Sequence, residues 1–420
     1  MRTRSLLRCA LALTILIVAD RTSSAYSVLT HEAIVDTLWK DTIIPALKSK
    51  YPDATDDDLT KAHAYAYGGC IIQDLGYYPF GSHLFTNLTH YVRSADFIQA
   101  LVDNEGNLND FAFALGAAAH YAADVDGHTI AVNKTVPLVY PELKEKFGNE
   151  VTYADDHASH LKTEFGFDVL QVARGHYAPK AYHDFVGFDV SKDLLDKAFQ
   201  QTYGLKLKDM FKTLDLALGT YRYSVKTLIP NATKTAWALK QKEIEQNEPT
   251  MNRKKFIYNI RKAEYTKEWG SDYQHPSFGA RFVAFLMRLV PKIGPFKSLA
   301  FKVPPPQGEK LFEESFDAAV KEDRKNFATI KDGKFAVPNR DLDTGKLVSP
   351  GEYMLTDQTY DELLKKLASK KFDAVTPQLR DNILAFYGRM KTPDPHGIDK
   401  ELQELKALKP TGAQTVSGTD

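Results

Sequence analysis

Apolar residues recur at helical spacing along most of the chain. Between residues 30 and 51 the apolar positions Ile34, Leu38, Ile44 and Leu47 fit one face of a helix. The same pattern predicts helices over residues 53–72, 94–102, 109–128, 157–173 and 207–228. Alternation typical of strands is scarce, and turn residues gather at residues 76–82, 103–107 and 140–149. The pattern therefore predicts an all-α, multi-helix domain.

The second part of the chain is less regular than the first. A polar stretch at residues 239–255 separates the two parts, and helical patterns reappear over residues 308–327 and 359–372. We therefore divide the chain into a signal peptide, a helical first domain, a mostly helical C-terminal extension with no assigned role, and a tail whose composition is typical of disorder. The predicted bounds are residues 1–25, 26–245, 246–407 and 408–420.

The first 25 residues have the pattern of a secretory signal peptide. A basic start precedes a mostly apolar core of eleven residues, 9–19, which is too short to span a bilayer. Ser23 and Ala25 fit the small positions of a cleavage site, so we expect Tyr26 to be the mature N-terminus of a secreted or periplasmic protein. An uncleaved anchor is the alternative. Cleavage leaves Cys70 as the single thiol, which excludes an internal disulfide and favours stabilisation by the core or by metal.

One helical stretch carries polar side chains in an apolar context. His120, Asp124 and His128 follow one another at four-residue spacing between several alanines, so they share one side of the predicted helix. An unpaired carboxylate buried there would cost several kcal/mol, on the order of the cost of other buried unpaired charges. A cation removes that cost, and histidine and aspartate suit zinc. A hydrogen-bonded His–Asp pair in the core is the alternative.

Further residues of the same chemical types lie elsewhere in the first half. His160 and Glu164 are four residues apart on another predicted helix, where a solvated pair is the alternative. Asp74, His90 and His31 complete the candidates, although a turn cap or a core histidine would explain the first two. The free α-amine and carbonyl of Tyr26 would chelate metal if the signal peptide is cut as predicted.

In order and spacing these residues resemble the zinc-dependent phospholipase C and single-strand-specific nuclease superfamily, in particular its bacterial phospholipase C branch. The resemblance covers about residues 26–180. It implies an all-helical fold and three zinc ions. Residue by residue, it implies that the metal ligands are Tyr26, His31, Asp74, His90, His120, Asp124, His128, His160 and Glu164. His83, His157 and Asp126 are nearby alternatives for individual positions.

The resemblance also implies how the ligands are shared. The first zinc would take Asp74, His90, His120 and Asp124, and the second would take Tyr26, His31 and Asp124, so that Asp124 bridges. The third would take His128, His160 and Glu164. Asp74 would be the catalytic residue, which orients or deprotonates the attacking water. The implied reaction is phosphodiester hydrolysis by a metal-activated water.

The substrate is less closely constrained than the reaction. Lys plus Arg number 54 and Asp plus Glu number 54, and this balance argues against nucleic acid as the main substrate. Aromatic residues near Asp74 and His90 would hold a quaternary ammonium, stack bases or pack in the core. They are Tyr65, Tyr67, Tyr77, Tyr78, Phe80, Phe85 and Tyr91.

We therefore expect a phospholipid or another phosphodiester as substrate. The alternatives are a single-strand-type nuclease and a metal-stabilised, non-catalytic envelope or binding protein. The basic, apolar composition of segment 278–301 suits a peripheral contact with a membrane surface. We prefer the simpler interpretation, a helix docked on the catalytic domain with its basic side chains reaching solvent.

Overall fold

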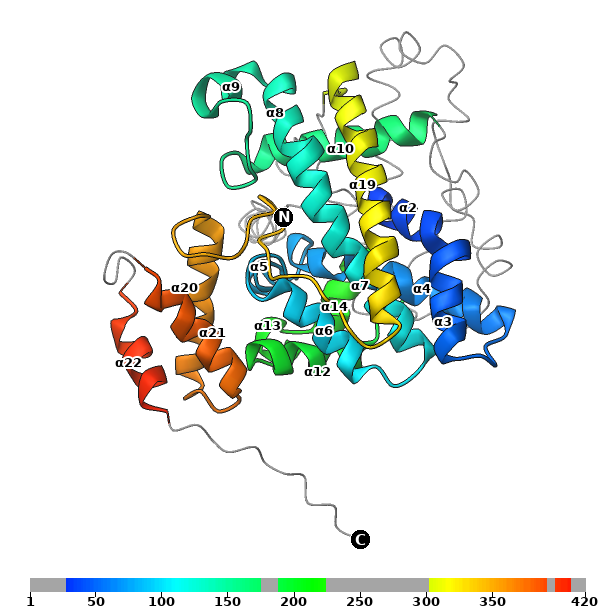
Figure 1. Cartoon of the computed structure of the whole chain (residues 1–420). Coiled ribbons are helices and arrows are strands. Elements are labelled where there is room, and N and C mark those ends of the chain that lie inside the picture. The colour runs from blue at the N-terminus through cyan, green and yellow to red at the C-terminus, as the bar shows by residue number, and fades with distance from the viewer. Residues whose placement is uncertain (1–27, 175–187, 224–301, 391–396, 409–420) are drawn as a thin grey trace, which may run out of the picture.

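A computed structural model describes residues 28–174, 188–223, 302–390 and 397–408 of the chain. All regular elements in these ranges are helices, apart from one isolated bridge between Arg340 and Leu347. The predicted all-α class is therefore confirmed. Figure 1 shows the helices of the first half gathered around α7, with α19 beside them and α20 to α22 grouped at one side.

The helices follow the predicted order. The first half contains α2 (Val28–Leu38), η1 (Trp39–Ile43), α3 (Ile44–Lys50), α4 (Asp56–Ile71), η2 (Ile72–Tyr77), α5 (His83–Tyr91), α6 (Ser94–Asn104), α7 (Leu108–Asp126), η3 (Gly127–Val132), α8 (Asn133–Val139), α9 (Pro141–Phe147) and α10 (His157–Arg174). The later helices are α12 (Lys192–Tyr203), α13 (Leu207–Met210), α14 (Leu214–Tyr223), α19 (Pro306–Ile330), α20 (Met354–Ser369), α21 (Pro377–Gly388) and α22 (Asp399–Ala407).

Local signals explain several helix ends, and two predictions are wrong. The helix predicted over residues 207–228 is interrupted after Met210, so its described part forms the separate helices α13 and α14. α4 begins after Thr55, whose side chain and that of Asp58 cap each other's backbone N–H groups, and this capping box fixes the start of the helix. Residues 140–149, predicted as a connection, contain the short helix α9, because Pro141 occupies its first turn, where proline is tolerated. The signal peptide and the basic segment 278–301 lie outside the described residues.

The pair α4 and α7 forms the centre of the core. A Cβ atom at Gly69 would lie 2.0 Å from the backbone oxygen of Phe113, and one at Gly116 would lie 2.0 Å from that of Ala66. The glycines therefore allow the two backbones to touch, and the alanines of α7 extend this close contact. One consequence is that the carbonyl of Cys70, at the end of α4, reaches the side chain of His120 on α7.

The C-terminal region packs on this core. α19 lies along α7 and η3, and the chain after it crosses towards α20 (Figure 1). On the way, the Leu342 N–H donates to the backbone oxygen of His90 at 3.1 Å. No helix in the described ranges is long and apolar enough to cross a membrane.

Asp323 on α19 gives a prediction about stability. Its carboxylate is fully buried, neither oxygen has a hydrogen-bond partner within the described ranges, and burial raises its pKa well above the ordinary value. The folded state therefore holds a proton that the unfolded state releases, and stability falls as pH rises above the ordinary range of an aspartic acid. We expect Asp323→Asn to raise the free energy of unfolding at pH 8 by about 1 kcal/mol, the usual size of a single-residue effect.

Denaturant unfolding of wild type and variant at pH 8 and pH 4 measures this effect. The gain should be smaller at pH 4, where the folded-state carboxyl is neutral and about half of the unfolded-state carboxyls are protonated as well. Equal stability of the two proteins at pH 8 would contradict the prediction.

Candidate metal centre

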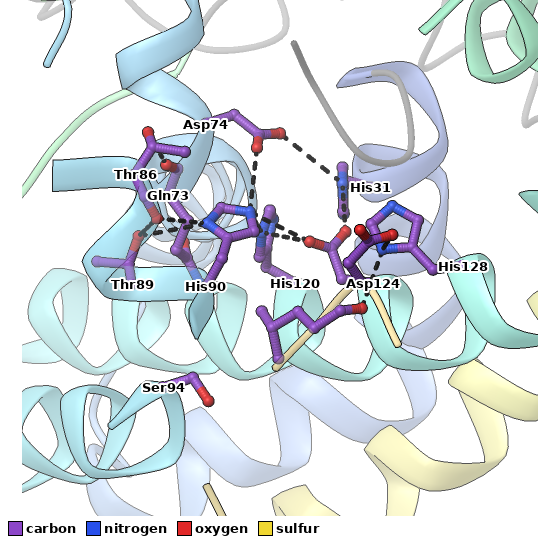
Figure 2. Close-up of polar contacts among 12 residues, drawn as sticks. His31, Gln73, Asp74, Thr86, Thr89, His90, Ser94, His120, Asp124 and His128 are labelled. Carbon is purple, nitrogen blue, oxygen red and sulfur yellow. Dashed lines mark hydrogen bonds and ion pairs between the residues drawn. The ribbon is translucent and has the colours of Figure 1, made fainter. Parts of the chain in front are cut away.

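Four side chains from three elements converge on one point. They are Asp74 of η2, His90 of α5, and His120 and Asp124 of α7, and all four are buried. The Nε2 atom of His90 lies 3.4 Å from Asp74 Oδ1, 3.2 Å from Asp124 Oδ2 and 3.2 Å from His120 Nε2. His120 Nε2 is itself 3.2 Å from Asp124 Oδ2. Figure 2 shows these atoms pointing toward one another.

Backbone carbonyls orient both imidazoles of this group. His90 Nδ1 lies 2.8 Å from the carbonyl oxygen of Thr86, and His120 Nδ1 lies 2.9 Å from that of Cys70. Because a carbonyl oxygen only accepts, each Nδ1 carries the proton and donates it. Each Nε2 faces the two carboxylates and would supply its lone pair to a bound metal. This tautomer is the one that a metal requires.

Asp124 also faces a third histidine, His31. Its Oδ1 lies 3.4 Å from Nε2 of His31, which is 4.0 Å from Asp74 Oδ2 (Figure 2). α2 presents His31 here because Asp168 of α10 accepts hydrogen bonds from Leu29 N–H and, at 2.5 Å, from the Thr30 hydroxyl. The two oxygens of Asp124 therefore face different histidines, as a bridging carboxylate would.

The charges of this group are strongly coupled. Burial, together with the neighbouring His120, lowers the pKa of His31 to about 4. Burial also acts against charge on His90, but contact with the Asp124 and Asp74 carboxylates outweighs it and raises that pKa to about 10. The pKa of Asp124 stays well below its usual range because the imidazoles outweigh the effect of burial. Several buried groups whose pKa values are shifted by one another's charges are typical of a functional site.

A second group lies beyond the end of α7. His128 is on η3, a stretch of π-helix that continues α7 directly, and His160 and Glu164 are on α10. Glu164 Oε1 lies 3.7 Å from Nε2 of His128 and 2.6 Å from Nδ1 of His160, without hydrogen-bond geometry to either. π-helical turns are frequent at functional sites, and here η3 places His128 next to His160 and Glu164.

The second group has a member that the sequence did not indicate. Asp343, from the chain between α19 and α20, is buried with its Oδ1 3.6 Å from His128 Nδ1 and 3.7 Å from His160 Nε2. Aspartate in a stretch such as DLDTG is usually a turn residue. No feature of the sequence marked it as part of the site.

The structure places the other candidates as follows. Tyr26 lies outside the described residues, so its role stays a prediction. His83 and His157 pack against Tyr77 and Tyr153. Among the described residues, the groups that would hold a metal ion include Asp343 with His128 and His160 but not His83, His157, Asp126 or Glu164. Glu164 is distinguished from the others because its Oε1 lies 2.6 and 3.7 Å from the rings of His160 and His128. The cluster therefore contains eight of the nine candidate ligands. They are His31, Asp74, His90, His120, Asp124, His128, His160 and Glu164.

The chemistry of these atoms fits zinc. Tetrahedral zinc with bonds of about 2.0 Å holds its ligand atoms roughly 3.3 Å apart. The separations of 3.2–3.4 Å around His90 Nε2 match this value. Both oxygens of Asp124 and of Glu164 are buried without a hydrogen-bond partner in the described part of the chain, a costly arrangement unless a cation is bound.

Comparison with known proteins agrees with this geometry. Residues 30–212 match the family model described as zinc dependent phospholipase C. No curated protein and no solved structure matches the chain. The matched range contains all eight gathered candidates and ends well before Asp343.

Proposed function

Residues 30–212 belong to the zinc-dependent phospholipase C family, and from this premise we propose that the protein hydrolyses the head-group phosphodiester of phospholipids. The observation that carries the proposal is the group around Asp124. Its two oxygens face His31 on one side and the pair His90 and His120 on the other, so it would bridge two zinc ions. His128, His160 and Glu164 would hold a third.

Zinc bound in this centre would supply Lewis acidity, which activates water and stabilises negative charge on phosphate oxygens. The chain itself supplies orientation and a proton acceptor. Asp74 has one oxygen 3.4 Å from His90 Nε2 and the other 4.0 Å from His31 Nε2, so its carboxylate lies between the first two sites. In the proposed mechanism this carboxylate orients the attacking water and accepts its proton.

Two tyrosines support a lipid head group as the substrate. The ring of Tyr77 lies 6.1 Å from that of His90, the ring of Tyr153 lies 5.8 Å from that of His160, and the two tyrosine rings are 6.2 Å apart. Rings placed between the two metal groups would contact a quaternary ammonium next to the phosphate. Other aromatic candidates serve the core, since Tyr67 donates to Asp36 and Tyr78 stacks on Tyr221.

Assay of the purified secreted protein tests the proposal. With phosphatidylcholine vesicles we expect zinc-dependent release of phosphocholine, and with single-stranded DNA we expect no comparable cleavage. Cleavage of DNA or RNA without release of phosphocholine would replace the lipid substrate by nucleic acid. Bound zinc with no turnover of any phosphodiester would favour a metal-stabilised, non-catalytic protein instead.

The proposal extends to the N-terminus and to location. We propose that the signal peptide is removed after Ala25, that the protein is secreted or periplasmic, and that the new amine of Tyr26 joins His31 at the second zinc. The intact mass of the secreted chain and its zinc content, measured on one sample, test this. A mature chain that begins elsewhere, or fewer than two zinc ions per chain, would contradict it. Peripheral contact with the membrane surface is part of the same proposal.

A further inference from the structure

The segment Leu342–Asp343 comes from outside the family-matched range and contacts both metal groups. Leu342 N–H donates to the backbone oxygen of His90, and the Leu342 oxygen lies 2.9 Å from Nδ1 of His128. Asp343 is buried at the second group. A part of the chain that follows α19 therefore reaches the centre from the side of the C-terminal region.

The two carboxylate oxygens of Asp343 have different surroundings. Oδ2 accepts hydrogen bonds from the N–H of Tyr153, at 3.0 Å, and from the hydroxyl of Tyr353. Oδ1 is buried without a hydrogen-bond partner among residues the structure describes, and it faces the imidazoles of His128 and His160 at 3.6 and 3.7 Å. The donors on Oδ2 fix the carboxylate so that its other oxygen is directed at the two rings.

The hydrogen bonds of those rings define their tautomers. His128 Nδ1 faces the Leu342 carbonyl and therefore donates to it. His160 Nε2 lies 2.8 Å from Oδ1 of Asn133, whose NH₂ group donates to the Asp343 carbonyl at 2.8 Å. That second bond orients the amide, so its oxygen faces His160 and accepts the Nε2 proton.

It follows that the opposite ring nitrogens have free lone pairs. These are His128 Nε2 and His160 Nδ1, which are both directed toward Glu164 and have no hydrogen-bond partner in the described ranges. A third metal would therefore bind on the Glu164 side of the rings. The Leu342–Asp343 segment lies on the other side, where each ring carries its proton.

We propose that Leu342 and Asp343 form the outer shell of the third metal site. They are positioning residues: Leu342 directly, and Asp343 through Asn133, set the tautomers of the two ligand imidazoles, and the Asp343 carboxylate stabilises the positive charge that a bound metal places on them. The inference rests on the proposed metal centre but not on the identity of the substrate. It gives the C-terminal region a function in the centre itself.

The test compares zinc affinity in full-length protein. Asp343→Asn keeps the shape of the side chain and removes its charge, and outer-shell changes typically weaken metal binding about 10–100-fold. The matched control is Asp341→Asn, because Asp341 lies in the same loop and its carboxylate caps Thr344. Zinc per chain is measured over a series of buffered zinc concentrations. In D343N we expect one of the three zinc ions to dissociate at a higher free zinc concentration than in the wild type. In D341N we expect the same titration as in the wild type.

Further variants keep the result decisive. Tyr353→Phe removes one donor to Asp343 Oδ2 but leaves the charge, so a several-fold weakening of the same zinc is expected even if D343N does not fold. Wild-type titrations in the folded variants would overturn the proposal. Loss of one zinc from D343N even at saturating zinc, as expected for Glu164→Gln, would overturn the outer-shell assignment and make Asp343 a ligand. Zinc content is independent of turnover, so these results do not depend on the phospholipase assay.

Discussion

Asp124→Asn is expected to abolish phosphodiester hydrolysis and to remove two of the three zinc ions. The carboxylate uses Oδ2 toward His90 and His120, at 3.2 Å from each Nε2, and Oδ1 toward His31, at 3.4 Å. An amide offers one neutral oxygen in place of two charged ones, so it cannot bridge two cations. The loss of activity should exceed the roughly 10–100-fold effect of changing an outer-shell residue.

The rate of phosphocholine release and the zinc content per chain measure this result on the same protein sample. Asp126→Asn is the matched control, since Asp126 is the last residue of α7 and lies in none of the groups that would hold a metal ion. It should keep wild-type activity and zinc. If D124N retained all of its zinc, Asp124 would not be the bridging ligand, whatever the effect on rate.

The histidines and aspartate at four-residue spacing on α7 and η3 show what spacing alone can predict. The four-residue interval correctly indicated that His120, Asp124 and His128 share one side of a helix, because that geometry depends only on the backbone. The interval does not say which residues serve the same metal. In the structure His120 and His128 belong to different groups, and this division followed from the family resemblance.

The contribution of the C-terminal region was not predictable in the same way. α19 was expected as a helix, but an amphipathic pattern does not identify the surface that it covers, and here the surface is α7. Asp343 is separated from His128 and His160 by about half of the chain, and its own neighbourhood has the composition of an ordinary turn. Contacts between distant segments are fixed by packing, which single-sequence patterns do not specify.

The aromatic residues illustrate a further limit. Their composition near Asp74 fitted ligand binding and core packing equally well. The structure separates the two, because Phe85 and Tyr78 pack on other rings of the core, whereas Tyr77 lies against His90. Only the position of each ring decides, and residue type alone does not carry that information.

Removing zinc with a chelator is expected to lower the melting temperature by about 5 °C or more. Without a cation the core contains the buried carboxylates of Asp124, Glu164 and Asp343, each with at least one oxygen that has no hydrogen-bond partner in the described part of the chain. Zinc at 100 times its dissociation constant stabilises a protein by about 2.7 kcal/mol per site. For a chain of this size each kcal/mol corresponds to roughly 2 °C.

Thermal unfolding with and without chelator, followed by addition of zinc or magnesium, measures the effect. Zinc should restore the melting temperature, whereas magnesium should not, because histidine nitrogens suit zinc and magnesium prefers oxygen ligands. A melting temperature that is the same with and without chelator would show that the carboxylates are stabilised in another way. The melting-temperature shift of single variants tests which zinc site each ligand belongs to. E164Q should lose the part of the melting-temperature shift that the third site contributes. D124N should lose the part that the other two sites contribute. Because the third site shares no ligand with the other two, the two losses should add to the wild-type shift.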